Sequence, residues 1–175
     1  MKNFEFAIIA SGQSIEDDGF LDALFETGCD DVTISLQKGA LIAEFNREAV
    51  SFSRAIASAC EQIEKAGANV ERIEPDHLVT LSEIAERCEL SKAAISLYTK
   101  GKRLDGFPSP TVKVTSKHPL WDWYQVADWL CSNSFIDKET VIRARIVKEA
   151  NIVINSSKIE HDGFAERLEK LEAAA

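Results

Sequence analysis

The most informative part of the sequence is residues 80–100, which read TLSEIAERCELSKAAISLYTK. Thr80 followed three residues later by Glu83 forms a capping box, so a first helix is expected to begin here. Ser91 is well placed to cap a second helix, which we expect to run from Lys92 to about Lys100. The stretch therefore predicts two short helices joined by a turn, which is a helix-turn-helix.

The residue types within this stretch define an inner and an outer side. The apolar positions that hold the helices together are Ile84, Cys88, Leu90, Ile95 and Tyr98. Ala85 supplies the small side chain that closely crossing helices need. Glu89 stands at the turn position where the backbone becomes left-handed and Gly is usual, at a cost of about 1 kcal/mol. A recognition helix presents its outer side to the DNA major groove, and here that side is Ser91, Lys92, Ala93, Ser96, Leu97 and Lys100. The alternative is an ordinary helical hairpin whose apolar residues serve only as core.

The residues that follow predict a β-hairpin, or wing, and a closing helix. Residues 111–115 alternate as a strand, residues 116–119 are turn-compatible, and residues 120–123 are expected to return as the partner strand. Val126, Trp129 and Leu130 then fall on one face of a short helix. Four further cations are expected to contact DNA from the exit of the second helix and from the wing: Lys102, Arg103, Lys113 and Lys117.

Two motifs in this region carry a resemblance to a known family. They are Phe107-Pro108-Ser109-Pro110 before the wing, and a helix with Trp121, Val126, Trp129 and Leu130 after it. With the helix-turn-helix, residues 80–131 resemble the AlpA/excisionase branch of the MerR-like winged helix-turn-helix DNA-binding proteins. The resemblance implies a transcription regulator or DNA-architectural factor of phage or mobile-element type. The wing departs from the Arg-rich pattern of that family, because it offers only Lys113, Lys117 and His118.

The aromatic residues of the same segment allow a different interpretation. Trp121, Trp123, Tyr124 and Trp129 could form a platform on which the bases of a single strand stack. The closing helix of a small domain also needs large apolar residues to cover its core. We therefore expect these four side chains to be core residues.

The first 78 residues have a different pattern, which predicts a β-α-β-β-α-β order. The expected strands are residues 4–10, 31–36, 40–45 and 70–74, and the expected helices run from Ser14 to Gly28 and from 51 to 66. Phe20, Leu21, Leu24 and Phe25 are expected on one face of the first helix. This order is typical of a ferredoxin-like domain, a fold that does not by itself indicate an activity. The strand phenylalanines are interpreted as core, so residues 1–78 are expected to bind a partner or act as a scaffold.

The C-terminal region, residues 134–175, is predicted to be helical. Asp137 and Thr140 form a cap-like start, and a second short helix carries Phe164, Leu168 and Leu171. Ile142, Ile146, Ala150 and Val153 form an apolar stripe at helical spacing. The stripe either packs on its own domain or pairs with a second copy. We expect pairing of the 137–155 helices in a homodimer, because two copies would double the contacts to DNA.

Charge and composition limit the remaining possibilities. The net charge of the chain is -9, but residues 80–118 hold 7 basic and 4 acidic residues. No window resembles a signal peptide or a membrane helix, and Cys29, Cys60, Cys88 and Cys131 have no metal-binding spacing. The sequence therefore predicts a cytoplasmic protein with free thiols, no cofactor, no metal and no membrane association.

These observations predict an α+β chain with three parts: a ferredoxin-like domain at 1–78, a winged helix-turn-helix at 79–133 and helices at 134–175. The expected function is sequence-specific binding of double-stranded DNA by a transcription regulator that is not an enzyme, since no residue set suits acid-base or nucleophilic catalysis. The alternative is an antitoxin or inhibitor-like protein. Its acidic N-terminal domain would hold a protein partner while the helix-turn-helix autoregulates.

Overall fold

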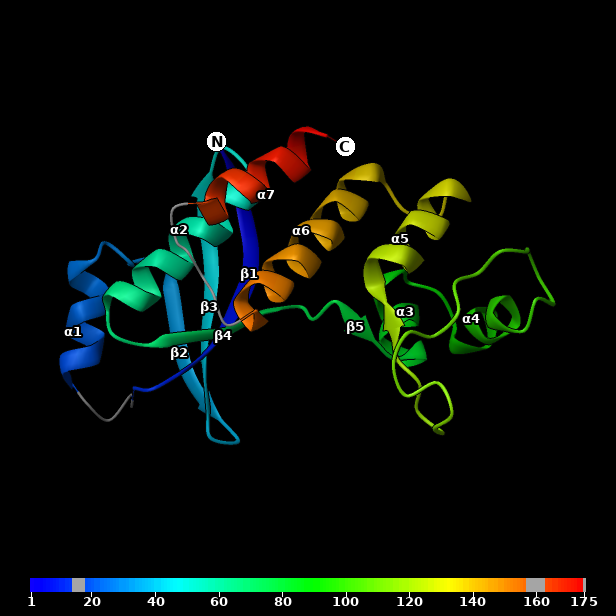
Figure 1. Cartoon of the computed structure of the whole chain (residues 1–175), viewed down its shortest axis with the longest axis horizontal. Helices are drawn as coiled ribbons and strands as arrows, with labels where there is room; N and C mark the ends of the chain where they lie inside the picture. Colours follow the sequence, from blue (N-terminus) through cyan, green and yellow to red (C-terminus); the bar gives the residue numbers. More distant parts are fainter. Residues whose placement is uncertain (14–17, 157–162, 175) are drawn as a thin grey trace. The chain divides into compact units, whose positions relative to one another are not determined.

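The computed structural model describes residues 1–13, 18–156 and 163–174, and its chain has two compact units (Figure 1). Unit 1 comprises Met1–Pro75 and Glu149–Ala175, and unit 2 comprises Asp76–Lys148. This division differs from the expected boundaries, because the region expected at 134–175 is not separate: residues 134–148 belong to unit 2 and residues 149–175 to unit 1. Helix α6 (Lys138–Asn155) contributes residues to both units. Because it combines helices with an antiparallel sheet, the chain is an α+β protein, as predicted.

Unit 1 contains a four-stranded antiparallel sheet with helices on one side (Figure 1). Its elements follow the predicted order: β1 (Lys2–Ser11), α1 (Asp18–Glu26), β2 (Val32–Gln37), β3 (Ala40–Ala49), α2 (Phe52–Lys65) and β4 (Asn69–Glu74). The strands are arranged β2-β3-β1-β4. Each helical connection therefore joins two strands that have a third strand between them. The expected helix start at Ser14 lies outside the described residues.

The two faces of the sheet follow the alternation of the strand sequences. In β1, Phe4, Phe6 and Ile8 are buried, whereas Glu5 is exposed and Ala7 is half-buried. Helix α2 buries Ile56 and Ile63 completely and ends at the predicted place, where Gly67 takes a left-handed conformation with φ 94°. The inner face of the sheet and the inner face of α2 thus form the apolar core.

The prediction for α1 needs a correction. Phe20 and Leu24 are buried as expected, but Leu21 is 41% exposed and Phe25 is 73% exposed. Successive positions on a helix are about 100° apart, so the residue after each buried one is turned away from the core. The outer side of α1 therefore carries two large apolar side chains in solvent.

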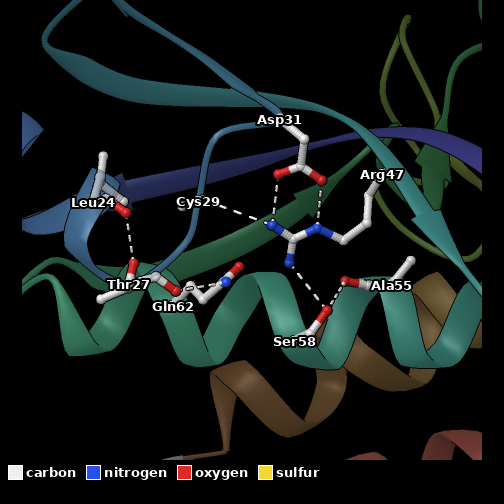
Figure 2. Close-up of polar contacts among 8 residues, drawn as sticks. All are labelled: Leu24, Thr27, Cys29, Asp31, Arg47, Ala55, Ser58 and Gln62. Carbon is white, nitrogen blue, oxygen red and sulfur yellow. Dashed lines mark hydrogen bonds and ion pairs between the residues drawn. The ribbon is translucent and has the colours of Figure 1, made fainter.

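A buried charge connects β3 to the loop before β2 and to α2 (Figure 2). The Arg47 side chain is 7% exposed, and its Nε and Nη2 donate to the two carboxylate oxygens of Asp31 at 2.8 and 2.7 Å. Its Nη1 donates to Ser58 Oγ at 3.0 Å, and its guanidinium lies over the Phe45 ring at 4.8 Å. Desolvation opposes the charged form, but the hydrogen bonds to Asp31 prevail and raise the pKa of Arg47. Bidentate pairing compensates for the burial of this charge.

The C-terminal helices pack within the chain. In α6, Ile146 and Ala150 are fully buried and Val153 is 6% exposed. The expectation that this stripe is free to pair with a second copy is therefore wrong, because the chain's own core covers it. Helix α7 (Phe164–Ala173) buries Phe164 and Leu168, as predicted.

A side chain from α6 bonds the edge of the sheet at one residue of β4. Asn151, which is 1% exposed, accepts from the Ile73 backbone N–H at 2.7 Å. The same amide donates to the Ile73 carbonyl oxygen at 3.0 Å. A buried amide with both ends bonded satisfies backbone groups that an edge strand would otherwise leave open.

Unit 2 is built from short elements around an aromatic-rich core. They are β5 (Leu78–Val79), α3 (Leu81–Arg87), α4 (Lys92–Thr99), β6 (Trp121–Asp122), α5 (Trp123–Ser132) and the first part of α6. The start of α6 has the predicted cap, because Asp137 Oδ1 accepts from Thr140 N at 2.7 Å, and this bond lowers the pKa of Asp137. None of the helices described in the chain is long and apolar enough to cross a membrane.

The buried ion pair of unit 1 gives a stability prediction. Asp31→Ala leaves the Arg47 guanidinium buried without its carboxylate, so the free energy of unfolding should fall by about 3 kcal/mol. Chemical denaturation followed by far-UV circular dichroism measures the change. Asp22→Ala, at an exposed position of α1, is the matched control and should change stability by less than about 0.5 kcal/mol. Equal effects of the two substitutions would contradict the structural role of the Arg47–Asp31 pair.

Candidate nucleic-acid interface

Two capped helices place the candidate interface on unit 2. Thr80 Oγ1 accepts from Glu83 N at 3.2 Å, and Glu83 Oε2 accepts from Thr80 N at 2.6 Å, which completes the predicted capping box of α3. Ser91 Oγ accepts from Ala94 N at 3.1 Å and caps α4. Both helices therefore begin at the residues that the sequence predicts.

The turn between α3 and α4 is a left-handed helix end. Glu89 has φ 54°, as its position predicts. Glu89 N donates to the Glu86 carbonyl at 3.2 Å, and Leu90 N donates to the Ala85 carbonyl at 2.9 Å. These two hydrogen bonds form a Schellman motif. The motif ends α3 and reverses the chain directly before the cap of α4.

The far end of α4 repeats the same motif with Gly in the left-handed position. Gly101 has φ 62°, and its N–H donates to the Tyr98 carbonyl at 3.0 Å. Lys102 N donates to the Leu97 carbonyl at 2.9 Å. Helix α4 is therefore defined at both ends by local hydrogen bonds, and the basic residues 102 and 103 follow directly after it.

The inner side of α4 is held by the core of unit 2. Ile95 is fully buried and Tyr98 is 2% exposed. The Tyr98 ring lies 5.3 Å from Trp129, 5.8 Å from Phe135 and 6.4 Å from Phe107 between ring centres. This aromatic cluster fixes the rotation of α4 about its axis and so determines which residues face solvent.

Two of the four aromatic residues expected in the core are buried, whereas Tyr124 and Trp129 are half-buried. Trp121 and Trp123 are buried. The indole N–H of Trp121 donates to the Pro108 carbonyl at 3.1 Å, and that of Trp129 donates to the Asp105 carbonyl at 3.0 Å. These bonds attach the 105–108 segment to β6 and α5. With two of these rings enclosed in the core, the single-strand stacking platform is not supported.

The structure places the predicted interface residues at the surface of unit 2. Ser96 is half-buried, and the others are exposed: Ser91, Lys92, Ala93, Leu97, Lys100, Lys102, Arg103, Lys113 and Lys117. Within the described part of the chain, none of these six cations has a carboxylate partner. By contrast, Arg47, Lys65 and Lys148 each form an ion pair. The positive charge of this segment is thus available to an external anion.

The predicted wing is much shorter than expected. The strand expected over residues 111–115 does not form, and one bridge joins Val112 to Leu120. Lys113 has φ 53°, which breaks the extended conformation. Trp121–Asp122 pairs with Leu78–Val79 and not with residues 111–115. The result is an exposed loop, residues 113–118, that carries Lys113, Lys117 and His118.

Two arginines of unit 2 make contacts that the sequence did not predict. The Arg103 guanidinium lies 5.7 Å from the centre of the Tyr98 ring, which restrains its exposed side chain. Arg87 instead donates to the Asp76 carbonyl at 2.9 Å and lies over Trp123 at 5.1 Å, so it belongs to the structure of the unit. These contacts join residues that are far apart in the sequence, so no local pattern predicts them. The only signal in the sequence is the presence of aromatic residues, which attract a guanidinium.

The chemistry of the site is that of a binding surface. Burial raises the pKa of the Cys88 thiol to about 11, so this residue is a neutral part of the packing around α3 and α4. Among the described residues, no group of three or more His, Cys, Asp or Glu side chains is placed to hold a metal ion. What the surface offers is exposed ammonium, guanidinium and hydroxyl donors on one short helix and the adjacent loops.

The two left-handed positions give a matched pair of stability predictions. Glu89→Gly removes the side-chain strain at φ 54° and should raise the free energy of unfolding of unit 2 by up to about 1 kcal/mol. Gly101→Ala should lower it by about 1 kcal/mol through the backbone alone, since an added Cβ meets no atom within 4 Å. All 3 tryptophans lie in unit 2, so tryptophan fluorescence during denaturation measures both changes. A loss of stability in Glu89→Gly would contradict the left-handed turn.

Comparison with family models, with curated proteins and with solved structures found no match to this chain.

Proposed function

We propose that the chain is a sequence-specific regulator of transcription that binds double-stranded DNA through α4 and the loops beside it. The observation that carries the proposal is a capped, outward-facing α4 whose exposed cations have no carboxylate partner in the described part of the chain. Its eight residues span about 12 Å, a length that fits the major groove, which is about 12 Å wide. The protein is proposed to act by binding and not as an enzyme.

The positions on α4 suggest a division of roles. Lys92 and Ser96, near the N-terminal half of the helix, are proposed to contact base edges, as recognition helices do. Ala93 and Leu97 lie beside them and offer apolar contact to thymine methyl groups. Lys100, Lys102 and Arg103 follow at the C-terminal end and are proposed to contact phosphates or guanine.

The class of fold is part of the proposal. The α3–turn–α4 pair, the short bridged loop at 112–120 and α5 support a winged helix-turn-helix of the AlpA/excisionase type, with a reduced wing. The β-α-β-β-α-β order and the β2-β3-β1-β4 sheet support a ferredoxin-like domain for unit 1. On this proposal Lys113 and Lys117 neutralise phosphates from the loop that replaces the wing.

An observation in unit 1 favours a second candidate function, the antitoxin or inhibitor-like role. The face of the sheet opposite α2 has a hollow of about 550 Å³. Its lining includes Glu5, Glu44 and Glu74 and no basic residue, and Asp31, which also lines it, is already paired with Arg47. A basic segment of a protein partner would complement such a surface. If the chain selects no DNA site, this second function becomes the better account of the molecule.

A selection experiment followed by substitution tests the DNA-binding function. The full chain should select a defined duplex from a random pool, and fluorescence anisotropy then gives its affinity. Lys92→Ala, Ser96→Ala and Lys100→Ala should each weaken specific binding by about 1–3 kcal/mol where the side chain contacts a base. Lys138→Ala, at an exposed position of α6, is the control and should bind like wild type. Wild-type binding by all three α4 variants would contradict the assignment.

A further inference from the structure

The strand β2 has a free backbone edge. It lies at one side of the β2-β3-β1-β4 sheet, whereas at the opposite side Asn151 bonds both backbone groups of Ile73 in β4. Lys38 and Gly39 form a two-residue hairpin loop with φ 53° and 81°, so Gln37 and Ala40 exchange backbone hydrogen bonds. Alternation then directs the N–H and C=O groups of Val32, Ile34 and Leu36 away from β3. No other described segment of the chain pairs with this side of β2.

The sequence of this edge lacks the features that normally prevent strand pairing. β2 reads VTISLQ, with no charged residue and no Pro. Its pairing with β3 runs through all six residues without a bulge. The other three strands of the sheet each contain charged residues. Exposed edges are usually protected by charges, Pro or bulges, so an unprotected edge is a site for another strand.

The charges that flank β2 indicate which strand pairs there. Asp30 precedes the strand and Lys38 follows it, and both are exposed. Neither has an ion-pair partner among the described residues. We propose that β2 pairs antiparallel with β2 of a second copy about a two-fold axis at Ile34. In this register Val32 lies opposite Leu36 of the second copy. Asp30, which precedes one strand, then comes to the end where Lys38 begins the hairpin loop of the other copy. The uncharged centre and the opposite charges at the two ends make the strand complementary to itself.

An apolar side chain at the edge supports the same partner. Leu36 is 50% exposed at the end of β2. Burial of Leu36 between two copies adds to the backbone hydrogen bonds. A six-residue strand gives a small interface, so the dissociation constant should be of micromolar order.

This inference is independent of the proposed DNA binding. The edge belongs to unit 1, and the experiment uses the full chain without DNA. Sedimentation velocity over a concentration series, up to about 100 μM chain, should show a monomer–dimer equilibrium. Leu36→Pro removes an outward N–H that β3 does not use, so it should be folded by circular dichroism and monomeric.

A charge swap tests the register. Asp30→Lys and Lys38→Asp each bring like charges together at both ends of the paired strands, and each should raise the dissociation constant at least about tenfold. The double variant, Asp30→Lys with Lys38→Asp, restores opposite charges and should return to within about threefold of wild type. A wild-type monomer at the highest concentration would overturn the proposal. So would a dimer that Leu36→Pro or the single swaps leave unchanged.

Discussion

The left-handed backbone at Glu89 is the constraint on which the candidate interface depends. It ends α3, reverses the chain and places Ser91 where it caps α4. The small, buried Ala85 supplies the carbonyl that closes this turn, and Ile95 and Tyr98 then set the rotation of α4. Because the inner residues of α4 are fixed in the core, its outer residues form one contiguous polar and basic surface. A change in the turn would therefore move every proposed contact to DNA together.

In unit 1 the corresponding constraints are polar and non-local. Arg47 joins residues from β3, the loop before β2 and α2 through one buried guanidinium. Asn151 brings part of α6 to the edge of β4. The β4 edge thus has Ile73 bonded by Asn151 and carries charged residues, whereas no charged residue and no described side chain protects the β2 edge. This difference is the physical reason to expect association at β2 and not at β4.

Local patterns predicted much of the secondary structure and of the interface. The capping box at Thr80, the cap at Ser91 and the left-handed Glu89 depend on residues within a few positions, and the structure contains all three. Arg47 lies two residues beyond the expected end of its strand at residue 45, and it falls on the inner face of β3 with Ala43 and Phe45. Its partner Asp31 could not be inferred, because that contact depends on how the strands pair.

The errors have tertiary causes. Residues 111–115 alternate like a strand, but the expected partner strand is used by β5 and only the Val112–Leu120 bridge remains. The α6 stripe was correctly placed on one helix face, yet its burial depends on residues far away in the sequence. A periodic pattern indicates that a face will be covered and does not identify what covers it.

NMR titration measures whether the outer side of α4 contacts DNA. The labelled full chain would be titrated with the duplex that it selects, and backbone amide shifts would be followed to saturation. We expect the largest changes at residues 91–103 and 113–118, with β2 and β3 unaffected. Saturable changes confined to unit 1, or none at stoichiometric duplex, would contradict this expectation.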